Sequence, residues 1–135
     1  MRFWTRLTIA AAFVAAAVVS PAAHHSHGQY DEAFTDLEGV VKEVHLVLPH
    51  SWVYMEQENP KGGAPILWAL EATSRSGLER IGVSRTYLKP GDKIKVRCHP
   101  LRDGTPGCLL GFMRGPDGQV KDWDGGKDVP ALENF

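Results

Sequence analysis

The chain has 135 residues, of which 43% are hydrophobic and 23% are charged, and its formal net charge at pH 7 is −1. This length is sufficient for one domain with a single core. The 15 Lys and Arg residues are balanced in number by 16 Asp and Glu residues, and no block of like charge occurs. The chain therefore has no basic region of the kind that binds nucleic acid. We therefore expect no nucleic-acid partner.

The first 22 residues have the pattern of an export signal. Arg2 and Arg6 form a positive start, residues 7–19 carry no charge, and small residues occupy the −3 and −1 positions of a cut after Ala22. The uncharged run is too short to span a membrane. We expect cleavage after Ala22, with a cut after Ala23 as the alternative. The product would be periplasmic or secreted, without stable membrane insertion.

Residues 23–36 are polar and lack a sustained period, which predicts an extended or mobile N-terminal arm that carries histidines. Alternation of apolar and polar residues then predicts a series of strands. The first contains Gly39, where a barrel strand can bend. The predicted strands are residues 37–48, 51–57, 66–72, 93–98 and 108–113.

One helix is expected between the third and fourth strands. Ser74 or Ser76 can cap a short helix that runs to Ile81, and Gly82 is suited to end it. Three strands, a helix and two strands follow the order of a small five-stranded Greek-key barrel of the OB type. We therefore predict a mainly β, OB-like domain over residues 37–120. An open antiparallel sheet with one packed helix is the alternative.

The segment after the barrel, residues 121–135, is rich in Gly and Asp, which predicts a flexible C-terminal tail. Asp122 and Asp124 lie near glycines, as calcium ligands often do. A complete calcium-binding loop is absent, so we interpret them as part of a solvated tail.

Two cysteines, Cys98 and Cys108, occur in the chain. An even count in an exported protein favours a disulfide. The intervening Asp103-Gly104 pair predicts a turn, and a hairpin centred on Asp103 sets the two cysteines directly opposite each other, with Leu110 and Phe112 also facing inward. Two free thiols acting as soft metal ligands are the alternative.

Several motifs together resemble a bacterial family of small exported proteins that is classed as a domain of unknown function. They are Ala-His-His-Ser at residues 23–26, Leu-Glu-Gly-Val-Val-Lys-Glu-Val at 37–44, Pro-His-Ser-Trp at 49–52 and Leu-Lys-Pro-Gly-Asp at 88–92. Tyr30-Asp31 belongs to the same pattern. The resemblance implies export and an OB-like β domain, and it carries no established activity. Leu48 departs from the family pattern, in which Asn commonly precedes Pro-His.

The new N-terminus carries the strongest chemical signal. After a cut behind Ala22, the α-amine, two backbone amides and the imidazole of His25 are the four nitrogens that Cu(II) or Ni(II) prefers. After a cut behind Ala23, the amine and imidazole of His24 can chelate copper together, with His25 or His27 completing the site. Either cut predicts a transition-metal site, copper first. A solvated stretch without a metal is the alternative.

His50 follows Pro49, whose fixed backbone aims it at the end of a predicted strand. It could join the histidines of the arm as a metal ligand, or hold the turn by a bond to a nearby backbone group. A different function, an envelope binding or interaction module without a metal, would use the aromatic residues Trp52, Tyr54 and Trp68 on the second and third strands. Aromatic residues are also ordinary core material.

Motifs of nucleophilic catalysis and phosphate binding are absent from the sequence. We therefore expect a binding protein without enzymatic activity, whose ligand is a metal ion or small molecule, and no cofactor other than copper.

The export signal predicts that the mature protein is recovered from the periplasmic fraction and is about 2 kDa lighter than its precursor. Fractionation of expressing cells, followed by mass spectrometry of the intact protein, measures both properties. Recovery of the full-length chain in the inner membrane would show an uncleaved anchor instead.

Overall fold

The computed structural model describes residues 27–135. The predicted signal, its cleavage site, His24 and His25 lie outside the described residues. The elements in chain order are η1 His27–Gln29, β1 Thr35–His45, β2 Ser51–Gln57, β3 Ile66–Ala72, α1 Arg75–Arg80, β4 Lys93–Pro100, β5 Gly107–Arg114 and β6 Val120–Asp122. Within this part of the chain no helix is long and apolar enough to cross a membrane.

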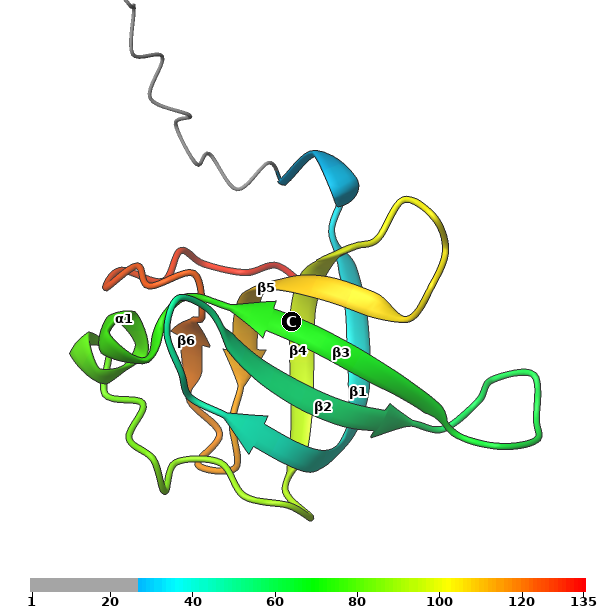
Figure 1. Cartoon of the computed structure of the whole chain (residues 1–135), viewed down its shortest axis with the longest axis horizontal. Coiled ribbons are helices and arrows are strands. Elements are labelled where there is room, and N and C mark those ends of the chain that lie inside the picture. Colours follow the sequence, from blue (N-terminus) through cyan, green and yellow to red (C-terminus); the bar gives the residue numbers. More distant parts are fainter. Residues whose placement is uncertain (1–26) are drawn as a thin grey trace, which may run out of the picture.

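Strands β1 to β5 close into a barrel (Figure 1). They follow the order β3-β2-β1-β4-β5 with antiparallel neighbours, and a parallel pairing between β3 and β5 joins the two ends. The short β6 adds to the outer edge of β5. The predicted mainly β, OB-like barrel is therefore confirmed, and the open sheet is wrong because β3 and β5 pair.

The barrel closes because β1 bends sharply enough to pair with two neighbours. Its first half pairs with β4 and its second half with β2. Gly39 lies at the change of partner, where a Cβ atom would collide with the backbone carbonyl of Glu56. A β-bulge between Val41 and Glu43 then adds twist. The sequence predicted a bend or bulge at Gly39; the bulge lies a few residues further on, and Gly39 instead permits the close approach of the Glu56 backbone.

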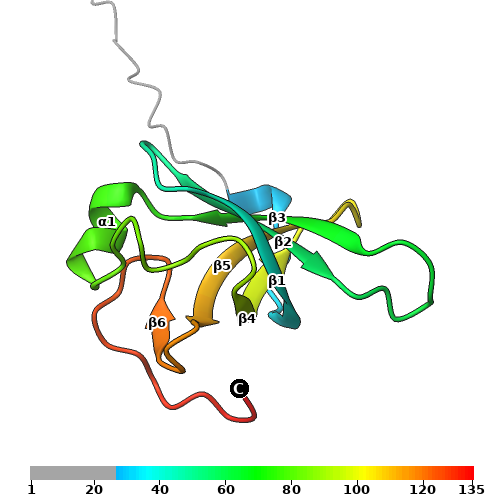
Figure 2. The ribbon, with the colours of Figure 1, turned by 90° about the horizontal axis from the view of Figure 1, so that it is seen from below.

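Helix α1 covers one end of the barrel, as the two views of the ribbon show (Figures 1 and 2). Ser74 caps it by accepting a hydrogen bond from the backbone N–H of Gly77 at 3.2 Å, and Leu78 is fully buried in the core. Of the two predicted caps, the structure uses Ser74. Gly82 follows the helix with a φ of +81°, which favours glycine.

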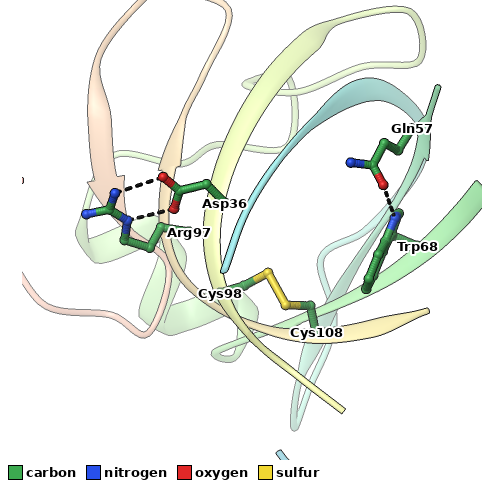
Figure 3. Close-up of a disulfide and its surroundings, with 6 residues drawn as sticks. All are labelled: Asp36, Gln57, Trp68, Arg97, Cys98 and Cys108. Atoms are coloured by element: carbon green, nitrogen blue, oxygen red, sulfur yellow. Dashed lines mark hydrogen bonds and ion pairs between the residues drawn. A yellow bond between two sulfur atoms is a disulfide. The ribbon is translucent and has the colours of Figure 1, made fainter. Parts of the chain in front are cut away.

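Cys98 and Cys108 form the predicted disulfide, and both are fully buried (Figure 3). The predicted register is nevertheless wrong. Cys98 pairs with Leu110, and Cys108 pairs with Pro100, so the disulfide joins diagonal positions of the β4–β5 hairpin. Closing this short loop stabilises the fold by about 2–3 kcal/mol.

A bulge at Gly111 causes the change of register. Arg97 pairs with Phe112 while Cys98 pairs with Leu110, so Gly111 is left without a partner on β4. The extra residue reverses the alternation beyond it. Met113 is therefore fully buried where the sequence predicted that Phe112 would point inward.

The first residues of the segment after residue 120 are packed into the domain. Trp123 is fully buried in the core, its backbone N–H donates to the Gly111 carbonyl at 2.7 Å, and its backbone carbonyl accepts from the Thr73 N–H at 3.0 Å. The predicted flexible tail over residues 121–135 is corrected for this part, because one large apolar side chain outweighs the polar composition around it. Further along, Phe135 lies beside the Arg97 guanidinium at 5.1 Å.

Replacing Trp123 by Ala should lower the free energy of unfolding by about 3–5 kcal/mol, because the change leaves a large cavity in the core. Urea denaturation followed by circular dichroism measures this loss. Val129→Ala, at a position that is 37% exposed, is the matched control and should change stability by less than about 0.5 kcal/mol. A similarly small loss for Trp123→Ala would mean that the segment is not part of the core.

Candidate functional site

A covered carboxylate on the outer face of the barrel is the centre of the site. Glu71 lies on β3 between Leu70 and Ala72, which both point into the core, so its side chain points outward. The residue is nevertheless only 9% exposed. The hydroxyl of Tyr30 donates a hydrogen bond to Oε2 of Glu71, and Nδ1 of His50 bonds Oε1. One carboxylate thus joins the arm, the β1–β2 loop and β3.

Tyr30 anchors the arm firmly to the barrel. The residue is 5% exposed, its carbonyl accepts from the Arg102 guanidinium at 2.7 Å, and the following Asp31 N–H donates to the Pro100 carbonyl at 2.8 Å. Burial, together with the bond to Glu71, raises the pKa of Tyr30 well above its ordinary value. The phenol therefore stays protonated and donates. Of the expected extended or mobile arm over residues 23–36, the part from Tyr30 onward is thus held on the barrel rather than mobile.

His50 is held by the Glu71 carboxylate, whereas the sequence pattern had suggested a nearby backbone group as its structural partner. Its side chain is 25% exposed, at the entry to β2 beside the 70% exposed Leu48. The bond from Nδ1 to Glu71 fixes the orientation of the ring. In the carboxylate–histidine pairs of metal sites, the carboxylate holds one ring nitrogen in this way and the other ring nitrogen coordinates the metal.

The histidine arm joins the barrel at Tyr30, which shares the Glu71 carboxylate with His50. His27 starts η1, three residues before Tyr30, a stretch that spans at most about 10 Å. His24 and His25, which lie outside the described residues, precede Tyr30 by a few residues more. Within residues 27–135 no three His, Cys, Asp or Glu side chains are grouped closely enough to hold a metal ion. The described barrel therefore supplies an oriented imidazole but no complete metal site.

The three aromatic residues of the alternative function do not share one face. Trp52 and Tyr54 lie on the outer face of β2, because Val53 and Met55 between and beside them are fully buried. Trp68 points inward, packs against the core and donates through Nε1 to Gln57 Oε1 at 2.9 Å (Figure 3). The predicted aromatic surface is thereby reduced to two residues.

The remaining histidines of the barrel lie outside the cluster. His45 is exposed on β1, 3.0 Å from a Glu43 carboxylate oxygen, with its ring edge against Tyr54. His99 on β4 packs against the ring of Phe34, with 4.0 Å between the centroids. Neither imidazole makes a hydrogen bond to the Glu71 carboxylate.

Sequence reasoning missed the two residues that orient His50. Tyr30 and Glu71 are separated by 41 positions, and no local period connects them. A weak signal existed for Glu71, since it is the only charged residue in the apolar run 66–72. Charged residues inside such strands are usually paired when they are buried.

Replacing Tyr30 by Phe should destabilise the fold by about 1–3 kcal/mol, because it leaves an oxygen of buried Glu71 without its donor. In the unchanged protein, stability should also fall as the pH rises above about 10, since the unfolded tyrosine ionises there while the buried one resists ionisation. Urea denaturation at pH 7 and above pH 10 measures both effects. The Phe variant should lose less stability in alkali.

Tyr54→Phe is the matched control, since the Tyr54 hydroxyl makes no hydrogen bond among the described residues. A Tyr30→Phe variant as stable as this control would contradict the proposed anchoring. The Tyr30→Phe variant should still lose some stability above about pH 10, because burial and a hydrogen bond to Asp117 also raise the pKa of Tyr87.

Two solved structures resemble the barrel, and both are of the mitochondrial single-stranded DNA binding protein Rim1 from S. cerevisiae. The first is 8% identical with a TM-score of 0.48 and covers 68% of this chain and 96% of that one. The second is 7% identical with a TM-score of 0.45 and covers 68% and 97%. No curated protein matches the chain.

The exclusion of nucleic acid as a partner is contradicted by these neighbours, because both are DNA-binding proteins. The net charge of the whole chain did not justify this exclusion, because a chain of negative net charge can still carry a local group of positive charges. Here Lys95, Arg97 and Arg114 surround the ring of Phe135. The likeness is too distant to assign a ligand to this chain.

A family model of unknown function matches residues 11–110, which is most of the chain and includes Tyr30, His50 and Glu71. This match confirms the resemblance to an uncharacterised family. The chain belongs to the family of unknown function DUF6152.

Proposed function

We propose that the protein is an exported, non-catalytic protein that binds a transition-metal ion, with copper as the favoured metal. The ligands would be the new α-amine with His24 and His25, and His27 or His50 would complete the site. The observation that carries the proposal is that Glu71 bonds both His50 and Tyr30, since this brings the base of the histidine arm to an oriented imidazole.

The chemistry of the ligand set favours copper. An amine, deprotonated backbone amides and imidazoles are the nitrogen donors that Cu(II) binds in tetragonal geometry. A carboxylate on Nδ1 increases the basicity of a ligating imidazole and fixes its direction. Glu71 would have this role for His50, and the hydrogen bond from Tyr30 would keep the carboxylate in place.

The arm would act as a tether. Because Tyr30 is fixed, the segment that precedes it in the sequence is attached to the barrel at a residue that shares the Glu71 carboxylate with His50. Such a tether raises the effective concentration of the arm ligands at the imidazole without requiring a preformed pocket.

The test measures Cu(II) affinity of the mature protein by competition with a chelator. Replacing His24 and His25 together by Ala should abolish tight binding, as should an uncleaved tag ahead of Ala23. His50→Ala and Glu71→Gln should each weaken binding by about 10–100-fold, which is the effect of losing an orienting partner at other metal sites. Affinity should also fall below about pH 6, because protons compete for the imidazoles.

His45→Ala is the matched control, since His45 is also bonded to a glutamate on the outer face of the barrel and lies near His50 in the sequence. It should leave affinity unchanged, and circular dichroism should show that every variant is folded. If the tagged protein and the double variant bind copper as tightly as the native chain, the terminal site is wrong.

A further inference from the structure

A cavity lies between the base of the arm, the β4–β5 hairpin and β6. Its volume is about 510 Å³, which lies within the range of small-molecule sites. Tyr30 forms part of its wall, yet the Glu71 carboxylate that Tyr30 bonds is not among the lining groups. The cavity is therefore adjacent to the proposed metal site and chemically distinct from it.

Aromatic rings form one wall of the cavity. Phe34 lies with its ring 4.0 Å from that of His99 and 6.2 Å from that of Phe112. It is 48% exposed, although it is a large apolar side chain in a concave surface. The floor is Gly111, where a Cβ atom would lie 2.9 Å from the Phe34 ring. The bulge at Gly111 thus creates the space in which this ring lies.

The rim of the cavity is acidic. Among the described residues, the carboxylates of Asp31, Glu32 and Asp122 line it, together with the guanidinium of Arg102. Arg102 directs its Nε to the carbonyl of Tyr30. With three carboxylates and one guanidinium, these described lining residues carry a net negative formal charge, which favours a cationic ligand.

The arrangement favours an organic cation over a metal ion. Within residues 27–135 the carboxylates and histidines do not converge on one point as metal ligands must. An aromatic wall next to dispersed carboxylates fits instead a ligand with an apolar body and an ammonium head, which a ring face also attracts.

A polar atom behind the aromatic wall is left unpaired. Nδ1 of His99 is buried and has no hydrogen-bond partner among the described residues. Such unpaired buried groups are uncommon in folded proteins. The ring of Phe34 lies directly against this imidazole, so the unpaired atom lies behind the aromatic wall of the cavity.

We propose that this cavity is a binding site for a small organic ammonium compound, with Phe34 contacting its apolar body and Asp31, Glu32 and Asp122 facing its charge. The ligand class is an amine that carries an aromatic or compact apolar group. The proposal goes beyond metal binding and does not depend on it.

The experiment uses the mature full-length protein with a chelator present, so that metal binding does not contribute. Phenethylamine, 2-phenylethanol and phenylacetate are titrated separately, and amide and aromatic signals are followed by NMR. The three probes share a phenyl group and differ in charge. Phenethylamine should shift signals of Phe34, Gly111 and Phe112 to saturation, the neutral alcohol should bind several-fold more weakly, and phenylacetate should not bind.

Variants locate the binding. Phe34→Ala, at a half-exposed position, should remove most of the phenethylamine affinity, and Asp31→Asn with Asp122→Asn should reduce it by about threefold for each lost charge. Glu38→Gln on β1, outside the cavity, is the matched control and should have no effect. Equal binding of phenylacetate and phenethylamine, an unaffected Phe34→Ala variant, or no saturation by phenethylamine up to about 10 mM would overturn the proposal.

Discussion

The covered carboxylate of Glu71 is the constraint on which the rest of the site depends. A carboxylate removed from water is costly unless hydrogen bonds replace its solvation. Here the replacement comes from two segments that are distant in sequence, Tyr30 of the arm and His50 of the β1–β2 loop. The same bonds that satisfy Glu71 therefore determine where the arm leaves the barrel and how the imidazole is directed.

The barrel supports this arrangement through local irregularities. The bulge in β1 and the close backbone approach at Gly39 let one strand pair with two neighbours, and the closed barrel leaves β3 parallel to β5. The bulge at Gly111 makes room for Phe34 and lets Trp123 pair with the backbone of β5. Interruptions of regular pairing often accompany functional sites. In this molecule the bulge at Gly111 borders the acidic cavity.

Much of the fold was predictable because local periodicity determines it. Strands β2 and β3 have the predicted bounds, since a period of two is unambiguous where inward residues are strongly apolar. Strand β1 was predicted at 37–48 and observed at Thr35–His45, and a bulge between Val41 and Glu43 interrupts its period of two. The hairpin register was wrong for the same reason, since a single unpaired glycine has no distinctive sequence signal.

The site was less predictable than the fold. His50 was identified because proline restricts its backbone, and the histidine arm because a cleaved terminus has known coordination chemistry. The orienting pair of Glu71 and Tyr30 was not identified, because its bond spans 41 residues and depends on barrel closure. The buried role of Trp123 was hidden by the polar residues around it.

The central claim is that Glu71 holds Nδ1 of His50 and thereby directs Nε2 to a metal. Long-range ¹H–¹⁵N correlation of the imidazole, recorded on the mature protein before and after addition of zinc as a diamagnetic substitute for copper, tests it most directly. The account predicts a proton on Nδ1 in the metal-free protein and a large shift of the Nε2 resonance when zinc binds. A proton on Nε2 that remains there in the presence of zinc would contradict it.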